Sequence, residues 1–165
     1  MIEHPDIDVC SASVDEFDDK TENVCSTRSL PENHEEIYKF GQRRNPINHP
    51  VSIFRKHVVE DVGSYQHYWL FEDYYLWARL MVKGAKFHNL PEPLLYFRRS
   101  TQMIKRRGGI KYAWTEIKFQ FTLHKIGYIG IATMIGNILV RLGVRVVPNW
   151  LRGIIYSKLL RKPKV

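Results

Sequence analysis

The chain has 165 residues, of which 44% are hydrophobic, 13% aromatic and 25% charged, and this composition excludes a globally disordered protein. Its two cysteines, Cys10 and Cys25, form no CxxC pair and no cluster with histidine at zinc spacing, which excludes a disulfide scaffold and a zinc domain. Residues 1–8 are acidic and lack an apolar stretch, so we expect no secretory signal and a cytosolic protein.

Positive and negative charges are separated along the chain, whose net charge is +8. Residues 1–97 contain 10 Lys and Arg against 16 Asp and Glu, whereas residues 98–165 contain 15 Lys and Arg against one acid, Glu116. Such a basic segment predicts an anionic partner, which is either a membrane surface or a nucleic acid.

The first third of the chain predicts a strand, a turn and a helix. Residues 9–14 alternate apolar and small polar side chains, as a half-buried strand does. The acidic run at 15–19 then predicts a solvated turn. Asn33 and Glu36 have the spacing of a capping box, which predicts a helix that ends at Gly41.

The middle of the chain continues this alternation of strands and helices. A short apolar strand is predicted at 51–54 and a helical turn at 57–62. Residues 71–83 predict a stronger helix, because their apolar positions share one side and a glycine follows. The apolar run at 94–97 follows two prolines and predicts a buried strand. Strands separated by helices predict an α/β core.

The basic segment predicts helices with large apolar surfaces. One apolar face of a long helix is predicted from four residues at i, i+4, i+7 and i+11: Ile110, Trp114, Ile117 and Phe121. Residues 126–140 carry no charge, but a membrane span needs roughly 20 apolar residues. Residues 141–162 mix apolar side chains with Lys, Arg and a tryptophan. We expect residues 126–162 to lie on an anionic membrane, and the alternative is a packed helix with a solvated basic face.

Candidate catalytic groups lie where the helix at 71–83 begins. The sequence has no GxSxG, Walker, HExxH or GxGxxG motif. Glu72 and Asp73 are adjacent carboxylates that the helix dipole keeps ionised, and one of them could accept a proton from a substrate hydroxyl. The plainer interpretation is that both cap the helix. His49, between Asn48 and Pro50, could point from its loop into a cleft or lie on the surface.

Several blocks in residues 3–109 occur in the order and at the spacing of a known family. They are HPDIDV (4–9), RRNPINHPVSIFRK (43–56), GSYQHYWLFEDYYLWARL (63–80), GAKFHNLPEPLLYFR (84–98) and KRRGG (105–109). They resemble the second half of bacterial family 2 glycosyltransferases of the capsule and exopolysaccharide, amylovoran-biosynthesis type. PNWLRGIIYSKLLRK (148–162) is similar to the basic, apolar tail of the same subgroup.

The resemblance implies an α/β fold in two parts. Residues 1–109 would form the acceptor-side half of an incomplete GT-A-like mixed sheet with flanking helices. Residues 110–165 would form a basic amphipathic helical tail on the membrane. The implied reaction transfers a sugar, with inversion, from a nucleoside diphosphate sugar to a glycan or lipid-linked acceptor in surface polysaccharide synthesis. The implied location is cytoplasmic, at the inner face of the plasma membrane.

The resemblance also assigns roles to five residues. Asp73 would be the base that takes the acceptor's proton, and Glu72 would hold the loop or contact the acceptor. Asn48 and His49 would lie on the acceptor side. Arg98 would face the diphosphate, where a guanidinium can stabilise the departing charge.

Three departures from the family accompany these roles. The nucleotide-binding half and its Asp-x-Asp motif, which binds Mg²⁺ or Mn²⁺, are not recognised here. Asp6 and Asp8 have the right letters but belong to the block that follows that motif, so we assign them no metal. Tyr75 replaces a second acid. We therefore expect no cofactor in this chain, Mg or Mn with a nucleotide-sugar in a complete relative, and little activity from the chain alone.

Two other functions remain open from the sequence. The first is a non-catalytic basic module that binds a membrane or a partner through residues 98–165. The second is nucleic-acid binding through the same residues. It is less well supported, because their basic side chains alternate with long aliphatic ones rather than with stacking aromatics, so we expect no nucleic-acid partner.

Overall fold

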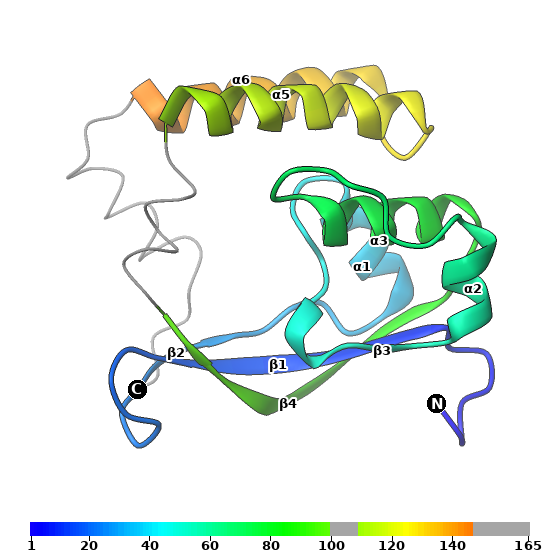
Figure 1. Cartoon of the computed structure of the whole chain (residues 1–165), viewed down its shortest axis with the longest axis vertical. Helices are drawn as coiled ribbons and strands as arrows, with labels where there is room; N and C mark the ends of the chain where they lie inside the picture. Colours follow the sequence, from blue (N-terminus) through cyan, green and yellow to red (C-terminus); the bar gives the residue numbers. More distant parts are fainter. Residues whose placement is uncertain (100–108, 147–165) are drawn as a thin grey trace.

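The computed structural model describes residues 1–99 and 109–146. These residues form three layers, which Figure 1 shows from the side. A four-stranded sheet lies at the bottom, three helices cover one of its faces, and a pair of longer helices lies above them. The predicted mixed α/β fold with flanking helices is confirmed. The predicted tail beyond residue 146 lies outside the described residues.

Strand β1 (Val9–Phe17) is the centre of the sheet. Strand β4 (Phe87–Arg98) pairs with it in parallel along its whole length and therefore occupies one edge. The other edge is shared by two short antiparallel strands, β3 (Ile53–Phe54) at the start of β1 and β2 (Val24–Arg28) at its end.

The acidic residues after the first predicted strand are part of that strand. Asp15 and Glu16 were expected in a solvated turn, but both lie in β1 and are buried. Thr27 of β2 donates a hydrogen bond to Asp15 Oδ1 (2.6 Å), and Ser26 donates one to Glu16 Oε2 (2.8 Å). The turn prediction was wrong because cross-strand hydroxyl donors satisfy these carboxylates inside the sheet.

The last strand differs from its prediction in length and exposure. A strand at 94–97 is confirmed, but β4 begins at Phe87, and Leu94 and Tyr96 are 60% and 58% exposed rather than buried. The two prolines do not delimit the strand. They lie within it, where its register against β1 shifts, and such a bulge accommodates residues that cannot donate to the ladder.

The helices of the middle layer follow their predictions closely. They are α1 (His34–Gly41), α2 (Lys56–Asp61) and α3 (Glu72–Val82). Asn33 is the N-cap of α1 but makes no side-chain capping bond, so the helix is confirmed and the capping box is not. A short 3₁₀ helix (His49–Val51) takes up part of the strand predicted at 51–54.

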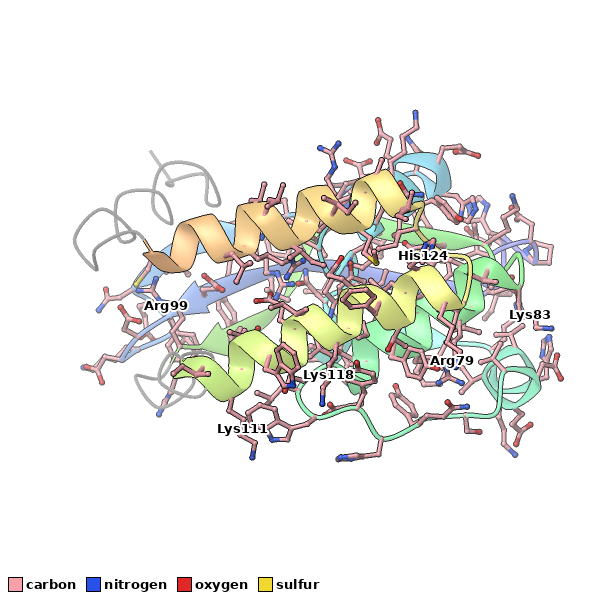
Figure 2. All side chains as sticks on the ribbon, turned by 90° about the horizontal axis from the view of Figure 1, so that it is seen from above. Arg79, Lys83, Arg99, Lys111, Lys118 and His124 are labelled. Atoms are coloured by element: carbon pink, nitrogen blue, oxygen red, sulfur yellow. The ribbon has the colours of Figure 1, made fainter. Side chains whose placement is uncertain are left out.

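The upper layer consists of α5 (Gly109–Lys125) and α6 (Ile131–Val146), which overlap at the same level in Figure 1 and lie side by side in Figure 2. Phe119 and Leu123 of α5 are fully buried against the middle layer. Polar groups join the two helices. Asn137 donates to Gln120 Oε1 (2.8 Å), and Arg141 forms an ion pair with Glu116. Within the described ranges, no helix has the length and apolar character that crossing a membrane requires.

Tyr128 lies in the turn between α5 and α6 and anchors the hairpin that these two helices form to α1. Its side chain is buried, and its hydroxyl donates to the carbonyl of Tyr38 (3.3 Å) and lies 2.9 Å from Met81 Sδ. A Cβ atom on Gly41 would lie only 2.1 Å from the same hydroxyl oxygen. Burial raises the pKa of Tyr128 far above its usual value, so the hydroxyl remains a donor.

We therefore predict that Gly41→Ala destabilises the protein by about 1–3 kcal/mol, the usual range for overpacking a close-packed core. Tyr128→Phe should recover part of this loss in the double variant, because it removes the atom that the new methyl meets. Gly136→Ala is the control, since a Cβ there meets nothing within 4 Å. Urea denaturation of the parent, the two single variants, the double variant and the control measures these differences. Strictly additive effects of Gly41→Ala and Tyr128→Phe would contradict the prediction.

Candidate active site

The candidate base, Asp73, is held in place at the start of α3. Its Oδ1 accepts a hydrogen bond from the backbone N–H of Tyr74 (2.7 Å), and its Oδ2 accepts one from the side-chain amide of Asn45 (2.8 Å). Asn45 is itself oriented by the N–H of Ile47, which donates to its Oδ1 (3.3 Å). Because a carboxylate has about four acceptor sites, the half-buried Asp73 keeps lone pairs for a further partner.

Helix capping explains only some of the contacts made by Glu72 and Asp73. Asp73 bonds one N–H of the first turn, but its other oxygen is bound by the loop residue Asn45. The adjacent Glu72 is exposed and makes no hydrogen bond or ion pair in the described part of the chain. The two carboxylates therefore differ: Asp73 is fixed in orientation, and Glu72 is available to a ligand.

The loop before α3 has an unusual backbone and borders an open hollow of about 330 Å³. Ser64 and Leu70 have φ angles of 56° and 65°, which residues other than glycine rarely adopt. Such backbone strain clusters at functional sites, where the surrounding structure maintains it. The hollow is lined by Tyr65, Gln66, His67, Trp69, Leu70 and Glu72.

Tyr65 connects this hollow to Asp73 and His49. Partial burial raises the pKa of Tyr65, and so does the negative charge of Asp73, which places the two groups within electrostatic reach. The His49 ring lies edge-on to the Tyr65 ring, with centroids 5.9 Å apart, and also 5.9 Å from the Trp77 ring. The exposed His49 is thus brought to the same side of α3 as the carboxylate.

Asn48 is buried beneath the loop that carries His49. Its side chain is buried, and its amide donates to the carbonyls of Ala12 (2.8 Å) and Arg28 (3.3 Å). The carbonyl of Asn48 accepts a hydrogen bond from Ser11 (3.1 Å). These contacts fasten the loop to β1 and β2 and so position the neighbouring His49, while the place of Asn48 on the acceptor side stays a prediction.

Arg98 lies at the far end of β4, with its guanidinium 5.3 Å from the centroid of the Phe17 ring. No contact found in the described part of the chain joins it to Asp73 or His49. The structure thus gathers Asp73, Glu72 and His49, whereas Arg98 lies at the end of β4 and its role at the diphosphate stays a prediction.

Two members of the site, Asn45 and Tyr65, were missed in the sequence analysis. Both lie inside blocks that carry the family resemblance, but neither has a reactive side chain at a recognisable spacing. Asn45 reaches Asp73 through a hydrogen bond and Tyr65 feels its negative charge, and the two residues come from separate loops.

The described residues include no group of three or more His, Cys, Asp or Glu side chains that could hold a metal ion. Asp8 is engaged otherwise: its Oδ2 accepts the N–H of Lys86 (2.8 Å), and its Oδ1 lies 3.9 Å from Arg55 Nε. The donor set around Asp6 and Asp8 therefore does not fit a divalent cation.

No protein-family model matches the chain. The chain is 36% identical over 162 residues to a UDP-Gal:alpha-D-GlcNAc-diphosphoundecaprenol beta-1,3-galactosyltransferase from Escherichia coli, covering 98% of this chain and 58% of that protein. It is 33% identical over 161 residues to the amylovoran biosynthesis glycosyltransferase AmsE from Erwinia amylovora, covering 96% and 59%. It is 32% identical over 160 residues to an uncharacterized glycosyltransferase from Haemophilus influenzae, covering 97% and 59%.

The protein is thus a homologue of glycosyltransferases along nearly its whole length. Its relatives include an enzyme of amylovoran biosynthesis, and the resemblance seen in the sequence is confirmed at that level. The chain spans 58–59% of the length of these curated relatives. The GT-A assignment and the absence of an Asp-x-Asp motif stay predictions.

The electrostatic link between Asp73 and Tyr65 is directly testable. Asp73→Asn should lower the pKa of Tyr65, because removing the negative charge makes the tyrosinate less unfavourable. Carbon NMR of labelled tyrosine against pH gives that pKa, with the signal assigned by Tyr65→Phe. Glu72→Gln is the matched control and should change the pKa less. An unchanged Tyr65 pKa in Asp73→Asn would show that the two groups are not close.

Proposed function

We propose that this chain supplies the acceptor-side portion of an inverting glycosyltransferase, with Asp73 as the general base. The observation that carries the proposal is the Asp73 carboxylate, fixed by Asn45 and the Tyr74 N–H beside an open hollow. The glycosyltransferase homologues support the same reaction class. The substrates are a nucleoside diphosphate sugar and a glycan or lipid-linked acceptor, used in surface polysaccharide synthesis.

The proposed reaction is a single displacement. Asp73 takes the proton of the acceptor hydroxyl as that oxygen attacks the anomeric carbon of the donor sugar. The bond from this carbon to the diphosphate oxygen breaks, and the nucleoside diphosphate leaves with the electron pair. The configuration at the anomeric carbon is inverted because attack and departure occur on opposite faces.

The neighbouring residues have supporting roles in this proposal. Asn45 keeps the carboxylate in one orientation, and a fixed base avoids reorganisation at the moment of reaction. Glu72 and His49 contact the acceptor, and the buried Asn48 holds the His49 loop against the sheet. Arg98 is proposed to stabilise the departing diphosphate. Because the Asp6 and Asp8 region does not fit a metal, no step is assigned to one.

The role of Asp73 is tested in a chimera in which this chain replaces the matching segment of the Escherichia coli relative. Asp73→Asn keeps the size of the side chain but cannot accept the proton, so kcat should fall by about 10²–10⁴-fold. Donor affinity should change little, because the proposed base does not hold the diphosphate. Galactosyl transfer from UDP-galactose measures both quantities.

Glu72→Gln is the matched control in the same chimera and should reduce kcat less, since its role is contact rather than proton transfer. Equal activity of Asp73→Asn and the parent chimera would remove Asp73 as the base. Glu72 and Asp73 would then only cap helix α3.

The 165-residue polypeptide by itself should transfer little or no sugar and bind nucleotide-sugars weakly. The reason is that it corresponds to 58–59% of the length of its relatives. Calorimetry with a nucleoside diphosphate and a radiolabelled transfer assay test this expectation. Robust metal-dependent turnover by the purified chain would contradict it.

A further inference from the structure

Helix α6 exposes an apolar face, and its inner face combines apolar and polar side chains. Two polar side chains point inward: Asn137 donates to the carbonyl of Gln42 (2.8 Å), and Arg141 donates to the carbonyl of Arg43 (2.6 Å). Every exposed residue whose side chain is described in α6 is apolar or glycine. These residues are Ile131, Ala132, Ile135, Gly136, Leu139, Val140, Leu142 and Gly143.

Helix α5 adds a second apolar stripe to the same outer surface. The predicted stripe of Ile110, Trp114, Ile117 and Phe121 exists, but it lies opposite the buried residues of the helix. Ile110, Trp114 and Phe121 are 89%, 59% and 54% exposed. Helical spacing places both stripes on the side of the hairpin that faces away from the protein core. Figure 2 looks onto this side.

Lysines border the apolar surface, and no exposed acid interrupts it. Lys111 and Lys118 lie along the edge of α5 (Figure 2), and Lys118 Nζ is 5.6 Å from the centroid of the Trp114 ring. Between residues 109 and 146 the only acidic residue is Glu116, which is buried and paired with Arg141. Among the described residues of the hairpin, the exposed outer surface is thus mainly apolar, with lysines at its border and no exposed acid.

We propose that the outer surface of α5 and α6 docks flat on an anionic membrane. Apolar side chains would enter the headgroup boundary, and the lysines would meet acidic lipid headgroups. A second copy of the chain fits less well, because two lysine-bordered surfaces would repel each other. A nucleic acid would leave the aliphatic side chains without a partner. The proposal rests on exposure and charge and does not depend on the proposed glycosyl transfer.

The sequence analysis placed membrane contact at residues 126–162. The surface in the structure begins earlier, at Ile110, and unites α5 with α6. Residues 147–162 lie outside the described residues, so the test must separate the hairpin from them. Substitutions confined to the hairpin of the full-length chain achieve this.

The test is co-sedimentation of the 165-residue chain with phosphatidylcholine vesicles that contain or lack phosphatidylglycerol. The parent should bind the anionic vesicles, and added salt should weaken the binding. The double variant Trp114→Ser/Leu139→Asp should bind at least about tenfold more weakly, because it replaces apolar groups that would enter the membrane with polar ones. Lys111→Gln and Lys118→Gln should each weaken binding about fivefold, the usual effect of one basic residue near an anionic surface.

Leu94→Asp is the matched control for Leu139→Asp, because the two leucines are 60% and 64% exposed on different faces of the protein. It should bind vesicles as the parent does. Circular dichroism and thermal melting show that each variant is folded, and analytical ultracentrifugation gives its oligomeric state.

Two results would overturn the proposal. The first is equal binding of the parent and the double variant to anionic vesicles. The second is a parent that does not bind vesicles but self-associates, together with a double variant that does not self-associate. The surface would then be an interface between copies of the chain.

Discussion

Helix α3 is buried on two opposite sides, and the positions of the other elements follow from that burial. On the sheet side, Trp77 packs against Phe54 and Phe87, with ring centroids 6.0 Å and 6.4 Å apart. On the hairpin side, Phe71 stacks on Phe119, with centroids 4.8 Å apart. Each such aromatic side chain contributes about 1.5–3 kcal/mol through burial. The helix whose first turn carries the candidate base is thus packed against both layers.

The polar side chains on the inner face of α6 have a cause in the middle layer. Helix α1 ends at Gly41, and the carbonyls just beyond a helix end need donors from elsewhere. Asn137 and Arg141 provide them, as donors to the carbonyls of Gln42 and Arg43. The underside of α6 therefore includes polar groups beside the buried Met134 and the partly buried Ile138, while its described exposed residues are apolar or glycine. The apolar surface that the hairpin exposes thus accompanies the hydrogen bonds that its inner face makes to the carbonyls after α1.

Local signals in the sequence were enough to find α3 and its end, since Gly84 adopts the left-handed conformation (φ +87°) that closes a helix. Local signals were not enough where the burial or contacts of a residue depend on residues distant in the sequence. The burial of Asp15 depends on Thr27 across the sheet. Periodicity could not choose between the two faces of α5, because the buried face has the same spacing as the exposed one. The bond between Asn45 and Asp73 joins two loops that have no common pattern.

The stretch from Arg43 to Asn45 is short and is held at both ends. Arg141 of α6 donates a hydrogen bond to the carbonyl of Arg43. Two residues later, the side-chain amide of Asn45 donates one to the carboxylate of Asp73. This stretch therefore links α6, in the outermost layer, to the candidate base through two hydrogen bonds. A shift of α6 that moved Arg43 would therefore reach the Asp73 carboxylate through only two peptide units.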